Sequence, residues 1–233
     1  MSAPLIDVLG VSLTGKAGPV FSDLTFSIER DRLTVVVGRS GSGRSALLLA
    51  VTGRMRRIRG EVQLGGGPVR PRELRRATSV ARLATLVEPE GQLSVGECVL
   101  ERSLLDDVPR AEAELAMATA EELLEVTFDR TLLVDQLDAY DRSLLCVALA
   151  TIRPASLLVL DDADRDLDLD DQRRLMAALT RLSAAGHAVL VATTEPTTVP
   201  HAAAVVELAP RPEDAAARAA ADMPTPTPQK KTA

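Results

Sequence analysis

The chain has 233 residues, of which 46% are hydrophobic and 26% charged, and its formal net charge is −6. That length is ample for a buried core, and the composition is ordinary for a globular protein. The acidic balance and the 2% aromatic content argue against nucleic-acid binding, which needs a basic surface or stacking rings. A local basic stretch, Arg54 to Arg59, does not change this expectation.

Membrane insertion is also not expected from the sequence. No apolar run approaches the ~18 residues that a membrane-spanning helix needs. The first residues show no basic region followed by a long apolar run, so no signal peptide is expected. The chain is therefore expected to be cytoplasmic and, if it works at a membrane, to depend on a partner that spans it.

Short apolar runs alternate with helical patterns along the chain, which predicts an α/β fold with a largely parallel sheet. Continuous β-branched runs such as LTVVV at 33–37 are typical of strands buried on both faces. The expected helices are 44–54, several between 95 and 149, and 169–185. The expected strands are 24–28, 33–37, 60–64, 84–87, 157–160, 189–192 and 203–208.

A glycine-rich segment, GRSGSGRS at 38–45, follows a predicted buried strand and opens a predicted helix. This is the context of a phosphate loop, GxxxxGK[ST], in which backbone N–H groups surround phosphate oxygens at a helix N-terminus. Its simpler alternative is an ordinary glycine-rich turn between a strand and a helix. The residues expected to bind a nucleotide are Gly38, Arg39, Ser40, Gly41, Ser42, Gly43, Arg44, Ser45 and Ala46.

The lysine position of this pattern is occupied by Arg44. Arginine keeps the positive charge, but its planar fork is larger than an ammonium and does not act as a compact point charge. We therefore expect phosphate binding to survive with less precise contact to the terminal phosphates. The Ser45 hydroxyl is expected to bind Mg²⁺.

Six further segments carry a family resemblance, and they occur in one consistent order. They are GEV at 60–62, LSVGE at 93–97, LDAYDRSLLCVALA at 137–150, LLVLDD at 157–162, RDLD at 165–168 and VLVATT at 189–194. Together with the phosphate loop they resemble the ATP-binding domain of ABC transporters over about residues 5 to 210. The resemblance implies a P-loop NTPase-like core in residues 1–210, with an inserted helical subdomain at about 93–153. Residues 211–233, rich in alanine and proline, are expected to form a disordered tail.

The resemblance also assigns roles, and several positions depart from the family pattern. It implies that Ser45 and Asp161 hold Mg²⁺ beside ATP, with Asp161 at the end of a strand adjacent to the one that precedes the phosphate loop. The catalytic glutamate is replaced by Asp162, the switch histidine by Thr194 and, in a shortened segment, the Q-loop glutamine by Glu88. The signature serine and glycines are replaced by Asp138, Ala139 and Tyr140.

Two functions remain open at this stage. The chain is expected to be an ATP-binding subunit that pairs with a transmembrane permease subunit, binds Mg-ATP weakly and hydrolyses it slowly or not at all. Alternatively, it is a pseudo-ATPase that acts as a structural or regulatory partner. A second ABC ATPase subunit could complete a heterodimer. In the family, one subunit supplies the phosphate loop and the other supplies the signature segment to the same nucleotide, and this chain departs from the pattern in both parts. A small kinase or GTPase is disfavoured by the helical insert and by the absence of an NKxD motif.

The remaining polar and sulfur-containing residues have simpler interpretations. The acids between Asp164 and Asp171 do not follow the DxDxDG spacing of a calcium loop, so a solvated loop and a helix N-cap are expected there. The two cysteines, Cys98 and Cys146, are expected to be buried. The two histidines, at positions 187 and 201, are expected to lie at the surface without a role.

Overall fold

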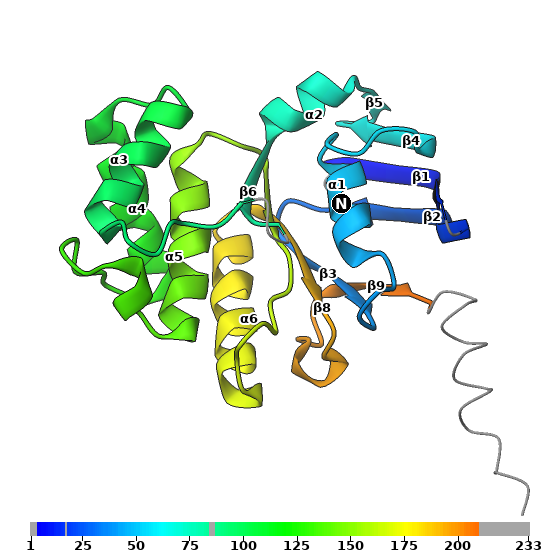
Figure 1. Ribbon diagram of the computed structural model, residues 1–233. Helices are drawn as coiled ribbons and strands as arrows, with labels where there is room; N and C mark the ends of the chain where they lie inside the picture. The colour runs from blue at the N-terminus through cyan, green and yellow to red at the C-terminus, as the bar shows by residue number, and fades with distance from the viewer. Residues whose placement is uncertain (1–3, 17, 84–86, 210–233) are drawn as a thin grey trace, which may run out of the picture.

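The computed structural model describes residues 4–16, 18–83 and 87–209 (Figure 1). Strands and helices alternate along most of the chain, as the apolar runs predict. In chain order the main elements are β1 (Ile6–Gly15), β2 (Gly18–Ile28), β3 (Leu33–Gly38), α1 (Arg44–Val51), β4 (Arg59–Leu64), β5 (Gly67–Pro68), α2 (Pro71–Ala77), β6 (Thr78–Arg82), α3 (Val95–Leu105), α4 (Arg110–Leu124), α5 (Ala139–Ile152), β7 (Leu157–Leu160), α6 (Leu169–Ala184), β8 (Ala188–Thr193) and β9 (Ala204–Leu208).

A five-stranded parallel sheet, in the order β6-β7-β8-β3-β9, forms the centre of the molecule. Strands β3, β7 and β8 are the continuous apolar runs, because they are buried along almost their whole length. Successive residues of β3 enter two different cores: Val35 belongs to the core that contains residues of α3, α4, α5 and α6, and Val36 to the core that contains residues of α1 and β1. The predicted α/β fold with a parallel sheet is confirmed.

A second sheet, antiparallel and ordered β2-β1-β4-β5, lies beside α1. The sequence predicts only parts of β2 and β4 within it. Strand β1 is interrupted by register shifts against both neighbours, so its alternation of apolar and polar residues is broken. Such irregular strands give a weak periodic signal, which explains why β1 is not predicted.

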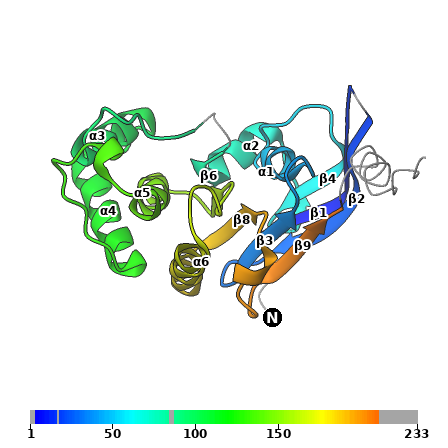
Figure 2. The same ribbon diagram turned by 60° about the horizontal axis from the view of Figure 1, so that its bottom comes forward.

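Helices α3, α4 and α5 lie together at one end of the molecule, away from strands β1, β2 and β4, in both views (Figures 1 and 2). Helix α5 is apolar around most of its surface because it packs against α3, α4, α6, β6 and β7. Among the described residues, no helix has the length and apolar content needed to cross a bilayer.

Three local predictions are wrong or fall at least partly outside the described residues. The strand expected at 84–87 falls largely on residues 84–86, outside the described residues, and the structure has strand β6 at Thr78–Arg82 instead. The expectation that Asp161 follows a strand adjacent to β3 is wrong, because β8 lies between β3 and β7. The expected tail at 211–233 lies outside the described residues, and the division at residue 210 stays a prediction.

Candidate nucleotide-binding site

The phosphate-loop segment connects the C-terminal end of β3 to the N-terminus of α1. Gly43 has φ +97°, and a Cβ atom there would lie 2.7 Å from Cγ1 of Val20, so only glycine fits this position. No side chain caps the N-terminus of α1, and no acidic residue lies in its first turn. The N–H groups at this terminus are therefore available to an external anion, as a phosphate cradle requires.

The Arg44 side chain folds back across this loop instead of extending into solvent. Its guanidinium donates one hydrogen bond to the Gly38 carbonyl and another, at 2.7 Å, to Oδ1 of Asp162. The Arg44 side chain is only 8% exposed, whereas that of Asp162 is 36% exposed. The guanidinium that the sequence predicts beside the phosphates is thus already hydrogen-bonded to the loop backbone and to Asp162, the residue at the catalytic glutamate position.

Asp161 is fully buried at the end of β7, and it is the best candidate ligand for a cation. Its Oδ1 accepts the backbone N–H of Asp162 at 3.0 Å, while Oδ2 is buried without a hydrogen bond of good geometry. Burial raises the pKa of the Asp161 carboxyl, and the Asp162 carboxylate adds to this, while the nearby Ser45 hydroxyl lowers the pKa. A buried carboxylate oxygen without a partner beside a serine hydroxyl fits Mg²⁺, which binds hard oxygen ligands.

Few other protein groups are available to hold that cation. Among the residues that the structure describes, no set of three or more His, Cys, Asp or Glu side chains is arranged as a metal site. Mg²⁺ in nucleotide sites commonly has one or two protein ligands and takes the rest from phosphate and water. Ser45 and Asp161 would hold Mg²⁺ in this manner, with the nucleotide completing its coordination.

The turn after β7 is held by a buried arginine that the sequence analysis does not single out. Arg82, at the end of β6, donates to the Asp161 carbonyl at 3.2 Å, the Asp162 carbonyl at 2.7 Å and the Ser143 hydroxyl at 3.2 Å. Asp162 has φ +45°, an uncommon value for a residue with a side chain. Arg82 therefore fixes the two aspartates relative to helix α5.

Thr194, at the switch histidine position, follows strand β8 and contacts a different acid. Its backbone N–H donates to Oδ2 of Asp164 at 3.1 Å, and its hydroxyl donates to the same oxygen. Within the part of the chain that the structure describes, no hydrogen bond connects Thr194 with Asp161 or Asp162. Threonine thus closes a local turn, and its hydroxyl lacks the proton chemistry of an imidazole near neutral pH.

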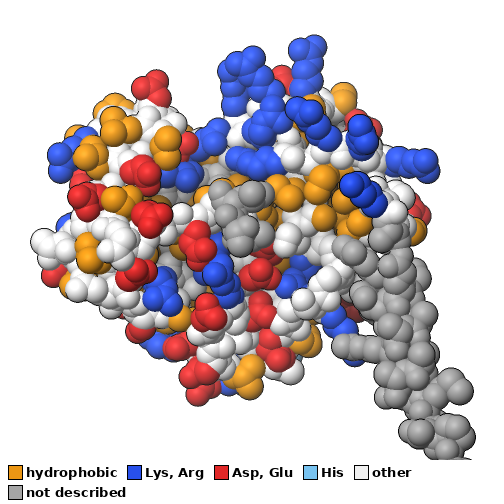
Figure 3. All heavy atoms as spheres, viewed as in Figure 1, with side chains coloured by type: hydrophobic (Ala, Val, Ile, Leu, Met, Phe, Trp, Pro, Cys, Tyr) orange, Lys and Arg blue, Asp and Glu red, His pale blue; other side chains and the backbone are white. Residues whose placement is uncertain are grey.

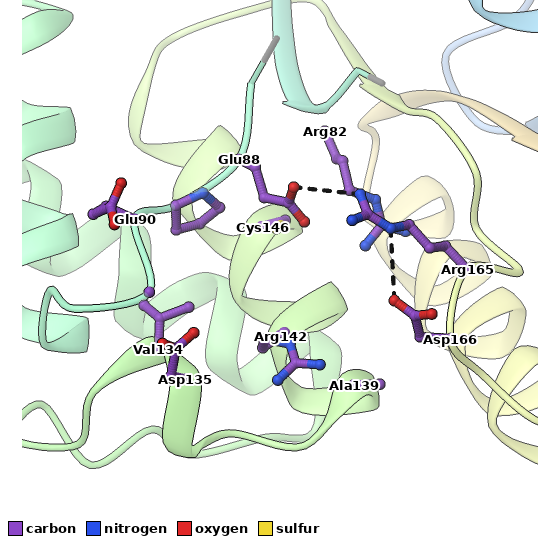
Figure 4. A pocket seen from close by; sticks show the side chains of 12 residues that line it. Arg82, Glu88, Glu90, Val134, Asp135, Ala139, Arg142, Cys146, Arg165 and Asp166 are labelled. Carbon is purple, nitrogen blue, oxygen red and sulfur yellow. Dashed lines mark hydrogen bonds and ion pairs between the residues drawn. The ribbon is translucent and has the colours of Figure 1, made fainter. Parts of the chain in front are cut away.

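Glu88 lies apart from the phosphate loop, at the edge of a pocket of about 490 Å³ between α5 and the loop after β7 (Figure 4). It pairs with Arg165 at 3.3 Å, and Arg165 also approaches Asp166 at 3.6 Å. No described hydrogen bond or ion pair connects Glu88 with Arg44, Ser45 or the two aspartates. The structure therefore brings together Arg44, Ser45, Asp161 and Asp162, and it leaves Glu88 and Thr194 outside this group.

The segment at the signature position forms the N-terminus of α5. Asp138 is its N-cap residue, and its Oδ1 accepts the Asp141 N–H at 2.8 Å. Burial raises the pKa of Asp141, and repulsion from Asp138 adds to the increase. The ring of Tyr140 faces the Arg174 guanidinium, whose central carbon lies 4.1 Å from the ring centre. This helix N-terminus is thus already capped by an anionic side chain.

The sequence does not predict the roles of two residues of the site: Arg82, and Asp164, which is expected only as part of a solvated loop. A charged residue inside an otherwise apolar strand segment is the one local signal that could have indicated Arg82, because buried arginines are almost always paired or hydrogen-bonded. Asp164 carries no comparable signal, since several acids follow it closely. Its contact with Thr194 arises only when β7 and β8 pair.

A parallel sheet with a phosphate loop after β3 and a buried acid after β7 defines a P-loop nucleotide-binding fold. Comparison with known proteins agrees: a family model described as ABC transporter matches residues 21–165. The hemin import ATP-binding protein HmuV of Myxococcus xanthus is 32% identical over 201 residues, which cover 79% of this chain and 73% of that protein. The chain belongs to the ABC transporter family.

Two further likenesses agree with this assignment. An ABC transporter ATP-binding protein of Streptomyces coelicolor is 29% identical over 195 residues, covering 81% of this chain and 68% of that protein. Among solved structures, CbiO1 of Clostridium perfringens, part of the ABC transporter complex cbiONQ, aligns with a TM-score of 0.76. That alignment is 16% identical and covers 89% of this chain and 85% of CbiO1, so it supports the fold alone.

Proposed function

We propose that this chain is an ATP-binding subunit of an ABC transporter that binds Mg-ATP weakly and hydrolyses it slowly or not at all. The proposal rests on one observation, the position of the Arg44 side chain. It occupies the lysine position of the phosphate loop, but its guanidinium is held by the Gly38 carbonyl and by Asp162. A nucleotide must compete with these contacts or bind without this cation.

Binding is supported by the parts of the site that remain intact. The uncapped N-terminus of α1 offers N–H groups to phosphate, and the Asp161 oxygen without a partner offers a ligand to Mg²⁺ beside Ser45. Bound Mg²⁺ would neutralise charge on the phosphates. Slow hydrolysis is supported by Asp162, which is shorter than glutamate and is paired with Arg44. Thr194 cannot supply the imidazole of the family's switch position.

A membrane partner is proposed on the same basis. The hemin import protein and the CbiO1 complex are transport proteins by name, and a chain of this family works with a transmembrane permease subunit. We propose that the docking groove for that subunit lies near residues 88–101, as the family resemblance implies. A groove of about 390 Å³ lies there, lined by α3, α5 and the segment after β6, and it includes Val87, Cys98 and Leu105. The chain would then lie at the cytoplasmic face of a membrane through this partner.

Calorimetric titration with Mg-ATP tests the proposal. We expect the dissociation constant of the wild type to lie between high micromolar and about 1 mM, the latter near −4 kcal/mol. Arg44→Lys should tighten binding about tenfold, because a lysine does not span Gly38 and Asp162 and its ammonium can reach phosphate. Ser45→Ala is the control that removes the expected Mg²⁺ ligand and should weaken binding in either background.

The alternative is a pseudo-ATPase that acts as a structural or regulatory partner, and the Arg44–Asp162 pair favours it because Arg44 is already engaged within the protein. If millimolar Mg-ATP produces no heat in the wild type or in Arg44→Lys, the loop serves only the structure and the alternative holds. If the wild type binds in the low micromolar range and Arg44→Lys changes nothing, the engaged arginine is not an obstacle and the reason given for weak binding is wrong.

A further inference from the structure

One region of this acidic protein carries a large excess of positive charge. Residues 54–76 hold eight arginines and only two acids, Glu61 and Glu73, although the chain as a whole has a net charge of −6. Most of these arginines are exposed, and only Arg54 is half-buried. We call this set the basic face: Arg54, Arg56, Arg57, Arg59, Arg70, Arg72, Arg75 and Arg76.

The basic face comes from the end of α1, the start of β4 and helix α2, which the fold brings to one side of the molecule. Figure 3 shows positive side chains gathered along the upper edge of the molecule in that view, where α2 and β4 lie, and acidic side chains mostly below it. A hollow of about 740 Å³ lies within this region, lined by arginines 54, 56, 57 and 75 together with Glu61. Charge is thus concentrated on one surface and not averaged over the molecule.

This charge is not neutralised inside the protein. Within residues 4–16, 18–83 and 87–209, no ion pair involves any arginine of the basic face. Glu73 is occupied as a helix cap, accepting the Arg70 N–H at 2.8 Å. Burial lowers the pKa of Arg54, and repulsion from Arg153, Arg75 and Arg102 lowers it further. Such a cluster is stabilised by an external anionic surface.

Exposed leucines lie near the basic face and indicate the kind of anionic surface. Leu104 and Leu105 at the end of α3 are 73% and 74% exposed. Leu105 lines the groove assigned to the membrane subunit together with Arg54 and Arg153, so the end of α3 lies beside the basic face. Leu104 is not among the residues that line this groove, and its exposed side chain is the one offered to lipid. Arginines beside exposed leucines suit a lipid interface, where headgroups take the charge and the acyl boundary takes the apolar side chains.

We propose that the basic face is a contact surface for anionic phospholipid headgroups, next to the groove assigned to the membrane subunit. The inference rests on the proposed function only for the position of that groove. It adds a direct lipid contact by a chain whose described helices do not cross the membrane. Arginines near an anionic leaflet contribute additively and in a salt-dependent manner, so a cluster of this size gives measurable binding.

Vesicle sedimentation with the full chain, without nucleotide or partner, tests the proposal. We expect binding to vesicles that contain phosphatidylglycerol, no binding to pure phosphatidylcholine, and loss of binding at high salt. Arg72→Gln with Arg76→Gln should weaken binding roughly 25-fold, at about fivefold per arginine. Neither side chain makes a described hydrogen bond, so the fold should persist, and circular dichroism checks this.

The matched control is Arg173→Gln with Arg174→Gln, which removes the same charge from two exposed positions of α6. This pair should leave vesicle binding unchanged within about twofold. Equal binding to both lipid mixtures, or equal loss in both double variants, would overturn the proposal. Tighter binding of a DNA duplex than of vesicles would overturn it in favour of a nucleic-acid surface. Because no nucleotide is present, a chain that binds Mg-ATP but no vesicles leaves the proposed function intact.

Discussion

Two helix N-termini of this molecule have the same backbone chemistry and opposite surroundings. The N-terminus of α1 has no side-chain cap and no acid in its first turn, whereas that of α5 is capped by Asp138 and has Asp141 in its first turn. By the family resemblance, the first would face the phosphates of the chain's own nucleotide, and the second would face those of a partner's nucleotide. The difference fits the proposed function: the N-terminus of α1 can accept an anion, whereas that of α5 already carries negative charge.

The largest effect expected from this difference is on turnover. The purified chain should hydrolyse ATP at least 10²-fold more slowly than an ordinary enzyme rate of ~10 s⁻¹, because each missing acid–base group typically costs 10²–10⁴-fold. A phosphate-release assay with saturating Mg-ATP measures this rate, and Ser45→Ala gives the background from contaminating ATPases. Turnover near 10 s⁻¹ that disappears in Ser45→Ala would show that Asp162 and Thr194 are sufficient.

The second effect concerns dimer formation. Two copies closed around ATP would bring Asp138 of each copy toward the other copy's phosphates, and like charges in a partly dry cleft cost several kcal/mol. Light scattering should therefore find a monomer at saturating Mg-ATP. Asp138→Ser with Asp141→Asn removes both charges and should permit some dimer with Mg-ATP. A nucleotide-dependent dimer of the wild type would contradict the comparison of the two helix ends.

The sequence predicts those parts of the site that depend on neighbouring residues, and it does not predict contacts between residues far apart in the chain. The apolar runs of β3, β7 and β8 and the glycine at position 43 act through their own neighbourhood, and the sequence predicts them well. The Arg44–Asp162 pair joins residues 118 positions apart in the chain, and nothing near either residue indicates that their side chains meet. The contacts of Arg82 likewise form only after β6 and β7 pair. A substitution within a motif can be read from the sequence. The residues that the new side chain contacts can be identified only from the folded structure.

A third prediction tests the cap of α5 directly. Asp138→Ala removes the acceptor of the Asp141 N–H and should lower the free energy of unfolding by about 1 kcal/mol. For a chain of this size that corresponds to a melting temperature roughly 2–4 °C lower. Asp138→Ser is the matched control, because serine is also a good N-cap, and it should melt within about 1 °C of the wild type. Equal losses in both variants would mean that the carboxylate has a role other than capping.

The smallest effect concerns the pH dependence of Asp141. Burial and the neighbouring Asp138 raise its pKa above the ordinary value of 3.8, so ionisation of this carboxyl is less favourable in the folded state than in the unfolded chain. The contribution of Asp141 to stability therefore decreases as pH rises from 3.8 through the raised value, and it stays reduced at neutral pH. The dipole of α5 favours an acid in its first turn and keeps the effect small.

Asp141→Asn removes this ionisation. Because the Asp141 carboxyl is partly exposed, solvent screening weakens its interactions. At pH 7 the variant should therefore be more stable than the wild type by only about 0.5 kcal/mol or less, which raises the melting temperature by at most about 1–2 °C. The gain should shrink as pH falls and disappear below the ordinary pKa of aspartate, where the wild-type carboxyl is protonated in both states. Thermal melts of the two proteins across this pH range measure the difference. A constant difference at every pH would assign the effect to packing, and a loss of stability at pH 7 would mean that the interaction of the carboxylate with the α5 dipole outweighs its burial.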